Sequence, residues 1–210
     1  MTLATLEHRA QHSAMLLSVP EFEAPEDISM IGLGLYTIAE ASAYTAIPAR
    51  DISRWLFGYG SSKNDDAQHY AGIWRPELAS LTSEKAVSFH DLLELRFVHA
   101  FRKHGVSLQA IRAASEHARN MFERAYPFTC TRFQTDGRSI FACVMESTRD
   151  ETLLDLVKKQ YVFKQVISSS LYEGIEYDDH GEADRWFPLG RNHSVVLDPE
   201  RQFGKPIVAA

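Results

Sequence analysis

The sequence contains no run of about 18 apolar residues, the length that a membrane-spanning helix requires. It also lacks a basic segment followed by a short apolar stretch, so we expect no secretory signal. We find neither internal repeats nor low-complexity tracts. With 210 residues, of which 45% are hydrophobic, the chain can form one large domain or two small ones. These features predict an ordinary soluble protein of the cytoplasm.

Recognisable catalytic, cofactor and metal motifs are also missing. There are nine histidines, but His99 and His104 are not placed on one helical face, and no HExxH or CxxC motif accompanies them. The Gly32-Leu33-Gly34 segment lacks the third glycine of a dinucleotide-binding loop. Asp178 and Asp179 fall in an expected turn, where solvation explains them. We therefore expect no enzyme activity, no cofactor and no metal, and we assign no catalytic residue.

The excess of acidic residues is unfavourable for nucleic-acid binding, because 28 Asp and Glu outnumber 22 Lys and Arg. The excess is not uniform along the chain. Residues 36–125 carry 11 basic and 10 acidic residues, whereas residues 1–35 carry 1 and 5. This middle segment is compatible with DNA binding, provided that local Lys and Arg residues contact phosphates.

The clearest local pattern predicts two short helices joined by a turn of about three residues. Thr37 and Glu40 have the spacing of a capping box, which starts a helix near Ile38. Thr45-Ala46-Ile47 interrupts that helix, and Pro48 supplies the backbone angle that suits the start of another. This arrangement is typical of a helix-turn-helix, although a simple corner between two helices has the same spacing.

The second helix is expected to bury one face and to expose the other. Ile52, Trp55 and Leu56 lie at i, i+3 and i+4 and should point inward. The outward residues near its start would then enter a major groove, as in helix-turn-helix proteins. A solvated surface is the alternative explanation for its arginines. The candidate DNA-binding residues, including two basic residues of the following segment, are Thr37, Ala49, Arg50, Ser53, Arg54, Lys63 and Arg75.

The elements expected next are a wing and a second pair of helices. A turn-rich stretch at 58–66 precedes Tyr70 to Trp74, which we interpret with Arg75-Pro76 as a short hairpin or wing. Ser88 with Asp91 should cap a helix that Gly105 closes. Ser107 should cap the helix after it.

This order resembles the winged helix-turn-helix of the MerR family. Tyr36 to Leu56 aligns with its first helices, and Gly105-Val106-Ser107-Leu108 with Ile111 resembles the junction that follows its wing. The resemblance covers about residues 35–122. The chain departs from the family pattern at Ala46, where glycine is usual, and at Pro48, where a serine or similar cap is usual.

The C-terminal half is expected to have an α+β structure. Asp136-Gly137 between two β-rich runs predicts a two-residue hairpin, in which Cys130 would lie opposite Cys143. Such a pair has the geometry of a disulfide, but a cytoplasmic protein should keep both thiols reduced. A buried thiol pair is therefore the simpler interpretation, and redox sensing is the alternative. A helix from Ser147 or Thr148, with Leu153, Leu154, Leu156 and Val157, should follow. Short strands are expected at 174–177, 184–187 and 194–197, the first two joined by a turn at 178–181.

A second resemblance concerns the C-terminal segment. The run Phe203-Gly204-Lys205-Pro206-Ile207-Val208 is similar to the entry of a DUF433-type domain, which accompanies MerR-like modules in VapB-type antitoxins paired with PIN-like ribonuclease toxins. We expect the rest of that domain to be missing here. The predicted organisation is an N-terminal segment (1–34), either flexible or an arm of a dimer, a mostly helical MerR-like winged helix-turn-helix (35–125), a small α+β domain (126–200) and the start of a DUF433-like domain (201–210).

The leading hypothesis is therefore an autoregulatory antitoxin: a homodimer that binds double-stranded DNA at its own operator and also binds a PIN-like toxin. The alternative is a ligand-responsive MerR-like regulator whose α+β half is a sensor, with pocket aromatics at Tyr161, Phe163, Tyr177 and Trp186. Core packing is the simpler explanation of those aromatics. A protein-binding module that has lost its DNA contacts is a third possibility.

Overall fold

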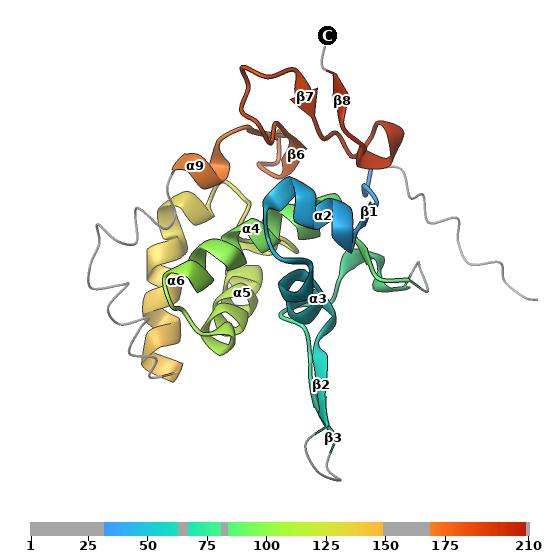
Figure 1. Cartoon of the computed structure of the whole chain (residues 1–210). Coiled ribbons are helices and arrows are strands. Elements are labelled where there is room, and N and C mark those ends of the chain that lie inside the picture. The colour runs from blue at the N-terminus through green and yellow to red at the C-terminus, as the bar shows by residue number, and fades with distance from the viewer. Residues whose placement is uncertain (1–31, 63–66, 81–83, 149–168, 209–210) are drawn as a thin grey trace, which may run out of the picture.

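The computed structural model describes residues 32–62, 67–80, 84–148 and 169–208. Its N-terminal part contains a helix pair, a hairpin and two longer helices (Figure 1). Their bounds are β1 Tyr36–Thr37, α2 Ile38–Thr45, α3 Ala49–Phe57, β2 Tyr59–Ser62, β3 Ala67–Tyr70, η1 Glu77–Ser80, β4 Ala86–Val87, α4 Phe89–Lys103 and α5 Leu108–Phe122.

The C-terminal part adds another helix and small strand pairs. Its elements are α6 Phe133–Thr148, α9 Ser169–Tyr172, β5 Ile175–Tyr177, β6 Ala183–Trp186, β7 Val195–Val196, η2 Gln202–Gly204 and β8 Ile207–Val208. All strand pairs in the described part of the chain are antiparallel: β1 with β4, β2 with β3, β5 with β6, and β7 with β8. The prediction of mixed helices and small strands is thus confirmed.

The predicted helix starts are confirmed at the level of single hydrogen bonds. The Thr37 hydroxyl accepts from the Glu40 amide, and the Glu40 carboxylate accepts from the Thr37 amide, which completes the capping box. Ser88 and Ser107 cap α4 and α5 through the amides of Asp91 and Ala110. These caps satisfy amides that a helix cannot satisfy itself, so local sequence fixes where the helices begin.

The turn between α2 and α3 contains a residue in an unfavourable conformation. Ala46 has φ 57° and ψ 22°, in the left-handed region that glycine adopts most easily. Ile47 is buried immediately after it, so the chain must turn sharply here to place that side chain in the core.

Ala46→Gly is therefore expected to raise the free energy of unfolding by about 0.5–1 kcal/mol, because relief of the left-handed strain exceeds the entropy that glycine adds to the unfolded chain. Chemical denaturation would measure the change. Ala39→Gly is the matched control. Ala39 is exposed within α2, so its replacement should lower stability by about 1 kcal/mol. A loss of stability in both variants would contradict the strain at Ala46.

The hairpin predicted around Asp136-Gly137 is wrong, because both residues lie inside α6. Phe133, Ile140, Phe141 and Val144 are buried at helical spacing, and this periodicity outweighs the local turn signal. Gly137 has a packing role instead: a Cβ there would meet the Phe133 ring at 2.9 Å.

The predicted pairing of the cysteines is wrong for the same reason. Cys130 precedes α6, is buried, and donates to the Pro127 carbonyl at 3.1 Å. Cys143 lies on α6 and is exposed. Neither is part of a strand, so they do not face one another across a ladder.

Two further predictions need correction or lie outside the described residues. The hairpin of this region is formed by β2 and β3, paired from Tyr59 with Tyr70 to Ser62 with Ala67. It begins in the expected turn-rich stretch at 58–66 and ends at Tyr70, and we call it the wing below. Tyr70 to Trp74 do not form a hairpin; Trp74 is buried in the core. Outside the described residues lie Lys63, Tyr161, Phe163 and the body of the helix expected from Ser147 or Thr148.

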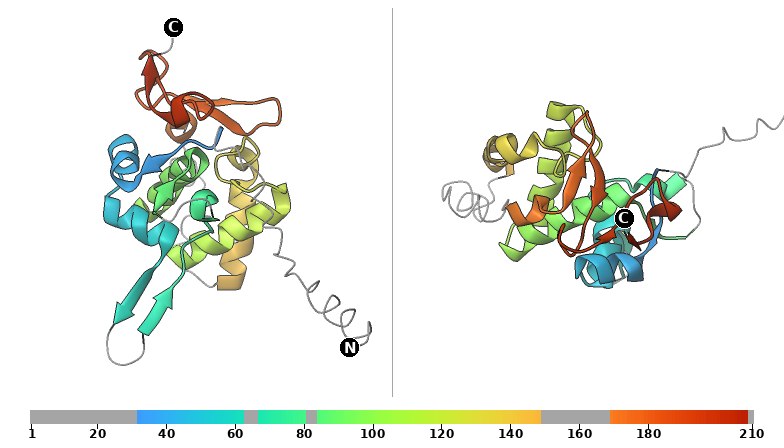
Figure 2. Two further views of the ribbon diagram at one scale, coloured as in Figure 1. Left: turned by 90° about the vertical axis from the view of Figure 1, so that its right-hand side faces the viewer. Right: turned by 90° about the horizontal axis from the view of Figure 1, so that it is seen from above.

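The strands expected at 174–177, 184–187 and 194–197 are confirmed as β5, β6 and β7. A bridge between Trp186 and Leu197 links the β5–β6 pair to the segment after β7. The C-terminal segment then returns to the start of the helix-turn-helix (Figure 2). There the Leu35 amide donates to the Phe203 carbonyl, and the buried Tyr36 hydroxyl donates to the Gly204 carbonyl, both at 2.8 Å.

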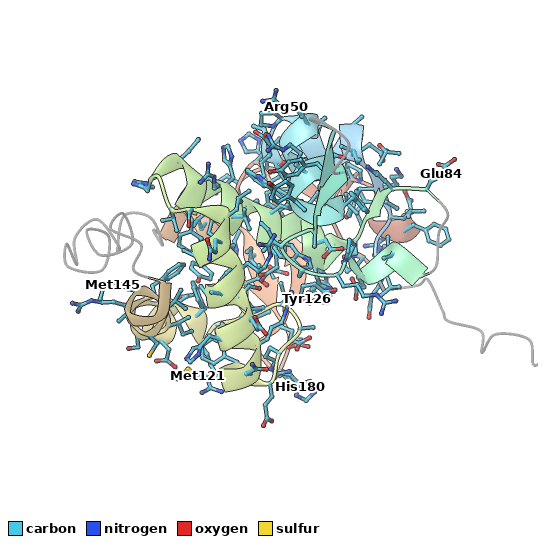
Figure 3. The ribbon with its side chains drawn as sticks, turned by 90° about the horizontal axis from the view of Figure 1, so that it is seen from below. Arg50, Glu84, Met121, Tyr126, Met145 and His180 are labelled. Atoms are coloured by element: carbon cyan, nitrogen blue, oxygen red, sulfur yellow. The ribbon has the colours of Figure 1, made fainter. Side chains whose placement is uncertain are left out.

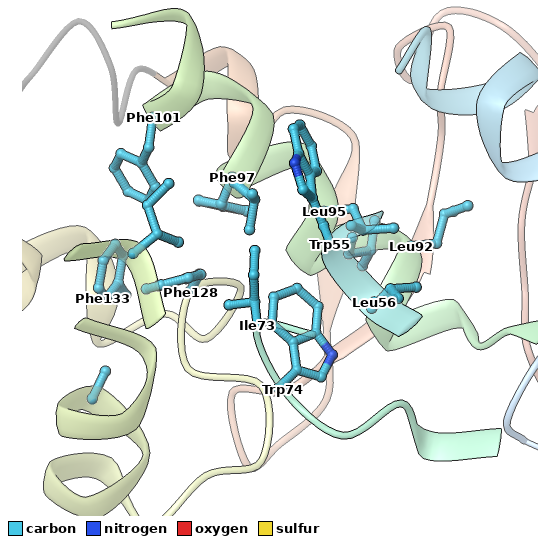
Figure 4. Packing of buried hydrophobic residues seen from close by; sticks show 14 of the residues in the cluster. Trp55, Leu56, Ile73, Trp74, Leu92, Leu95, Phe97, Phe101, Phe128 and Phe133 are labelled. Carbon is cyan, nitrogen blue, oxygen red and sulfur yellow. The ribbon is translucent and has the colours of Figure 1, made fainter. Parts of the chain in front are cut away.

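The buried apolar residues form one cluster that runs through both halves of the chain. In Figure 4, Leu92 and Leu95 of α4 lie beside Trp55 and Leu56 of α3, and Phe97 and Phe101 of the same helix lie toward Phe128 and Phe133. Phe101 packs edge-on against Phe128, with ring centroids 5.6 Å apart. The helix α4 therefore joins the helix-turn-helix to the C-terminal half.

Candidate nucleic-acid interface

The helix α3 has one buried and one exposed face, as the sequence predicts. Ile52, Trp55 and Leu56 are at most 6% exposed and attach the helix to the core. Ala49 and Arg50 are exposed at its N-terminal end. The Arg50 side chain is 82% exposed and lies 3.9 Å from the Asp51 carboxylate, too far for a strong ion pair. It extends away from the body in Figure 3.

Arg54 and the wing form a stacked arrangement. The Arg54 guanidinium lies 4.3 Å from the centre of the Tyr59 ring. Tyr59 in turn stacks on Tyr70, with centroids 4.8 Å apart and planes inclined by 17°. Because Tyr59 and Tyr70 are direct cross-strand partners, the hairpin restricts the orientation of a cationic side chain of α3.

The root of the wing is attached to α3 by very close backbone packing. The Ile73 amide donates to the Trp55 carbonyl at 2.6 Å. A Cβ on Gly72 would lie 2.1 Å from the Leu56 carbonyl oxygen, and one on Gly58 would lie 2.2 Å from the Tyr70 carbonyl oxygen. Only glycine permits this approach. The wing, which projects from the body in Figure 1, therefore has a fixed direction relative to α3.

Two further cationic residues, Arg102 and Lys103 at the end of α4, lie beside α3 and are not among the residues predicted from the sequence. With Arg54 they line a cavity of about 290 Å³, together with Asp51, Trp55, His99 and Leu108. Burial, aided by the charge of Lys103, lowers the pKa of His99. Basic residues at the end of a helix such as α4 usually stabilise its dipole. Their sequence context therefore gives no sign that they lie beside α3.

The outward residues nominated from sequence do not all lie together. Ser53 is half-buried and accepts a hydrogen bond from the Lys85 ammonium at 3.3 Å. Thr37 is exposed at the start of α2, but its hydroxyl is used in the capping box. Arg75 is exposed next to Trp74, whose indole is bonded to Asp91 at the N-terminal end of α4. Arg54 instead lies beside the C-terminal end of α4, so Arg75 does not join this group.

Two buried carboxyl groups of α4 bond to neighbouring segments of the chain. Asp91 accepts from the Trp74 indole at 2.6 Å and from the Glu77 amide at 3.1 Å, and burial raises its pKa. Glu94, one turn further along α4, is fully buried and accepts from the amide and hydroxyl of Thr129. Burial raises the pKa of Glu94 to about 7. Since both carboxyls bond to structural groups, we assign them to the architecture.

Two of the aromatic residues considered for a sensor pocket lie in the described residues. Trp186 is 3% exposed, and the Arg96 guanidinium covers its ring at 4.4 Å. Tyr177 packs against the same core. Both side chains thus serve packing. Within the described ranges, no group of three or more His, Cys, Asp or Glu residues is placed to hold a metal ion.

Comparison with known proteins supports a helix-turn-helix in this region. Residues 34–115 match a family described as "Putative DNA-binding HTH domain". Residues 34–115 form a helix-turn-helix domain. No helix in the described part of the chain is long and apolar enough to cross a membrane.

A longer similarity extends into the C-terminal half. The chain is 28% identical over 186 residues to the "Putative antitoxin VapB45" of Mycobacterium tuberculosis. The aligned region covers 82% of this chain and 76% of the relative. It also resembles the crystal structure of Rv2018 from the same organism, with a TM-score of 0.59, 24% identity, and coverage of 85% of this chain and 81% of the other. At that identity the structural likeness concerns the fold alone.

Proposed function

We propose that this chain is a DNA-binding antitoxin that represses its own promoter. In this proposal two copies place α3 in successive major grooves of a palindromic operator, with each wing along the adjoining backbone, as in MerR-type proteins. The main support is the exposed N-terminal half of α3, where Arg50 extends into solvent and the Arg54 guanidinium packs on the Tyr59 ring of the wing. The family match over residues 34–115 supports the same role.

The distribution of charge supports phosphate contacts at this surface. Arg54 of α3 and Arg102 and Lys103 of α4 line one cavity beside the outward side of α3, and the exposed Arg50 lies one turn before Arg54 on the same helix. Affinity for DNA depends on such local cations, so an acidic chain can bind DNA through one face. Lys63 and Arg75, which were nominated from sequence, are secondary candidates for backbone contacts.

The antitoxin role rests on the similarity to a relative named as an antitoxin. We propose that its partner is a PIN-like ribonuclease toxin, that the C-terminal half provides the binding surface, and that the complex acts in the cytoplasm. The protein would then act by binding, without a catalytic step. Co-expression with a PIN-like protein encoded by a neighbouring gene, followed by co-purification, tests this part separately from DNA binding.

Arg50→Ala and Arg54→Ala are each expected to weaken operator binding about tenfold and to reduce the log–log salt slope by about one, because each removes one cationic contact with the DNA. Electrophoretic mobility shift at several salt concentrations, with DNA from the chain's own promoter, measures both quantities. Arg138→Ala is the matched control. Arg138 is an exposed arginine on α6, and its loss should change neither quantity. If Arg50→Ala and Arg54→Ala behave like this control, α3 is not the reading helix.

A further inference from the structure

Phe203 is an exposed aromatic residue held in a costly backbone conformation. Gln202 and Phe203 have φ of 49° and 55°, which bulky residues rarely adopt. This conformation points two carbonyls towards β1. The Phe203 carbonyl accepts from the Leu35 amide, and the Gly204 carbonyl accepts from the Tyr36 hydroxyl. The Phe203 side chain is left 55% exposed. Backbone strain of this kind concentrates at functional sites, and the ring itself has no role in those two bonds.

A cavity of about 530 Å³ adjoins this aromatic ring. It lies between the start of the helix-turn-helix, the segment from Glu84 to Ala86 that leads into β4, and the C-terminal turn. Apolar groups from all three segments line it, among them Leu35, Ala86 and Phe203 itself. A cavity of this size accepts large side chains. An exposed aromatic beside an apolar hollow is the usual form of a protein–protein anchor.

The charges around the cavity favour a second copy of the chain as the occupant. Its lining contains Glu40 and Glu84 as well as Lys85 and Lys205, so the two signs are balanced. Lys205 pairs with Glu40 across the C-terminal turn. In a two-fold interface each patch meets itself, and only a patch of balanced charge can do so without repulsion. The chain as a whole carries a net charge of −6, so a patch of balanced charge repels a second copy less than the average charge of the chain would.

We infer that this surface, formed by Phe203 and the cavity beside it, is a homodimer interface in which two copies of the chain exchange their Phe203 rings. Each ring packs into the partner's cavity, and the Glu84–Lys85 pairs of the two copies face one another with opposite signs. The homodimer is part of the proposed function. The inference adds where the two copies meet, and it has its own test in the absence of DNA.

Sedimentation velocity of the full chain without DNA tests the interface. The unaltered chain should be a dimer at micromolar concentration, and Phe203→Asn should weaken dimerisation at least 30-fold, as expected for an aromatic anchor. Asn tolerates the left-handed conformation better than Phe. The monomeric variant should therefore unfold at a slightly higher temperature than the unaltered chain does when it is diluted to a monomer. Met121→Gln is the control, because Met121 is 47% exposed on α5 and lies on another side of the molecule from Glu84 (Figure 3).

Charge reversal distinguishes a second copy from any other occupant. Glu84→Lys alone leaves one acid and three bases in the patch and should weaken the dimer, whereas adding Lys85→Glu in the same chain restores the balance and should restore dimerisation. A monomeric unaltered chain, or a Phe203→Asn variant that dimerises as tightly as the control, would overturn the inference. A dimer that fails to shift operator DNA would instead refute the proposed function and leave the interface intact.

Discussion

Gly72→Ala is expected to lower the free energy of unfolding by about 3 kcal/mol, at the upper end of the cost of overpacking. The added Cβ would lie 2.1 Å from the Leu56 carbonyl oxygen and 3.1 Å from that of Trp55. Both neighbours are backbone atoms of α3, so no side chain can move aside to make room. For a chain of this length the melting temperature should fall by roughly 6–12 °C, which differential scanning calorimetry measures directly.

Gly60→Ala, in the strand β2 of the wing, provides the matched control. A Cβ on Gly60 would meet no atom within 4 Å, and its φ is not in the positive region. The melting temperature should therefore change by no more than about 2 °C, since surface substitutions usually stay within 0.5 kcal/mol. Equal effects of the two substitutions would show that the contact between the wing and α3 is not rigid.

The same pair of variants relates the fold to the proposed function. If α3 and the wing contact DNA as one rigid unit, Gly72→Ala must disturb both surfaces at once, because the strand β3 leads directly into Gly72. We expect operator binding to be lost at temperatures where the variant is still folded. Gly60→Ala should retain operator binding. The comparison would show that DNA binding requires the correct direction of the wing and not only an intact hairpin.

Local sequence signals predicted the parts of the fold that depend on single turns of helix. Thr37, Ser88 and Ser107 each marked a helix start correctly, because a capping side chain bonds to amides only two or three residues away. The inward face of α3 followed from the spacing of Ile52, Trp55 and Leu56 for the same reason. Such signals need no knowledge of distant parts of the chain.

The failures occurred where distant residues decide the structure. Asp136-Gly137 is a strong local turn signal, yet the burial of Phe133, Ile140 and Phe141 against α4 and α5 makes the segment a helix. Tertiary packing therefore outweighed the local preference. The cysteine pairing failed with the hairpin on which it depended.

The cationic surroundings of α3 were missed for a related reason. Lys85 and Lys103 are 32 and 50 positions from Ser53, and only the packing of α4 and β4 brings them near α3. The contact between the C-terminal turn and β1 joins residues 168 positions apart. No periodicity or motif within one sequence predicts contacts over such separations.

The stability of the protein should depend on pH through Glu94. Its pKa is raised to about 7 because the folded chain buries the carboxyl completely, whereas in the unfolded chain it ionises near its ordinary value of about 4.3. Between these values the unfolded chain has lost a proton that the folded chain retains. The free energy of unfolding therefore falls as pH rises from about 4.5 to 7, and the contribution of Glu94 becomes constant above that range.

Glu94→Gln should remove this dependence, because glutamine copies the protonated carboxyl and its amide oxygen can still accept from the amide and hydroxyl of Thr129. Between pH 4.5 and pH 8, the free energy of unfolding of the variant should rise by about 3 kcal/mol relative to that of the unaltered chain. Urea denaturation of both proteins across this pH range measures the difference in their free energies of unfolding. Other groups titrate alike in the two proteins, so their contributions cancel in this difference. Glu116→Gln, on the exposed side of α5, is the control and should leave the pH profile unchanged. A Glu94→Gln profile parallel to that of the unaltered chain would mean that the buried carboxyl ionises at its ordinary pKa.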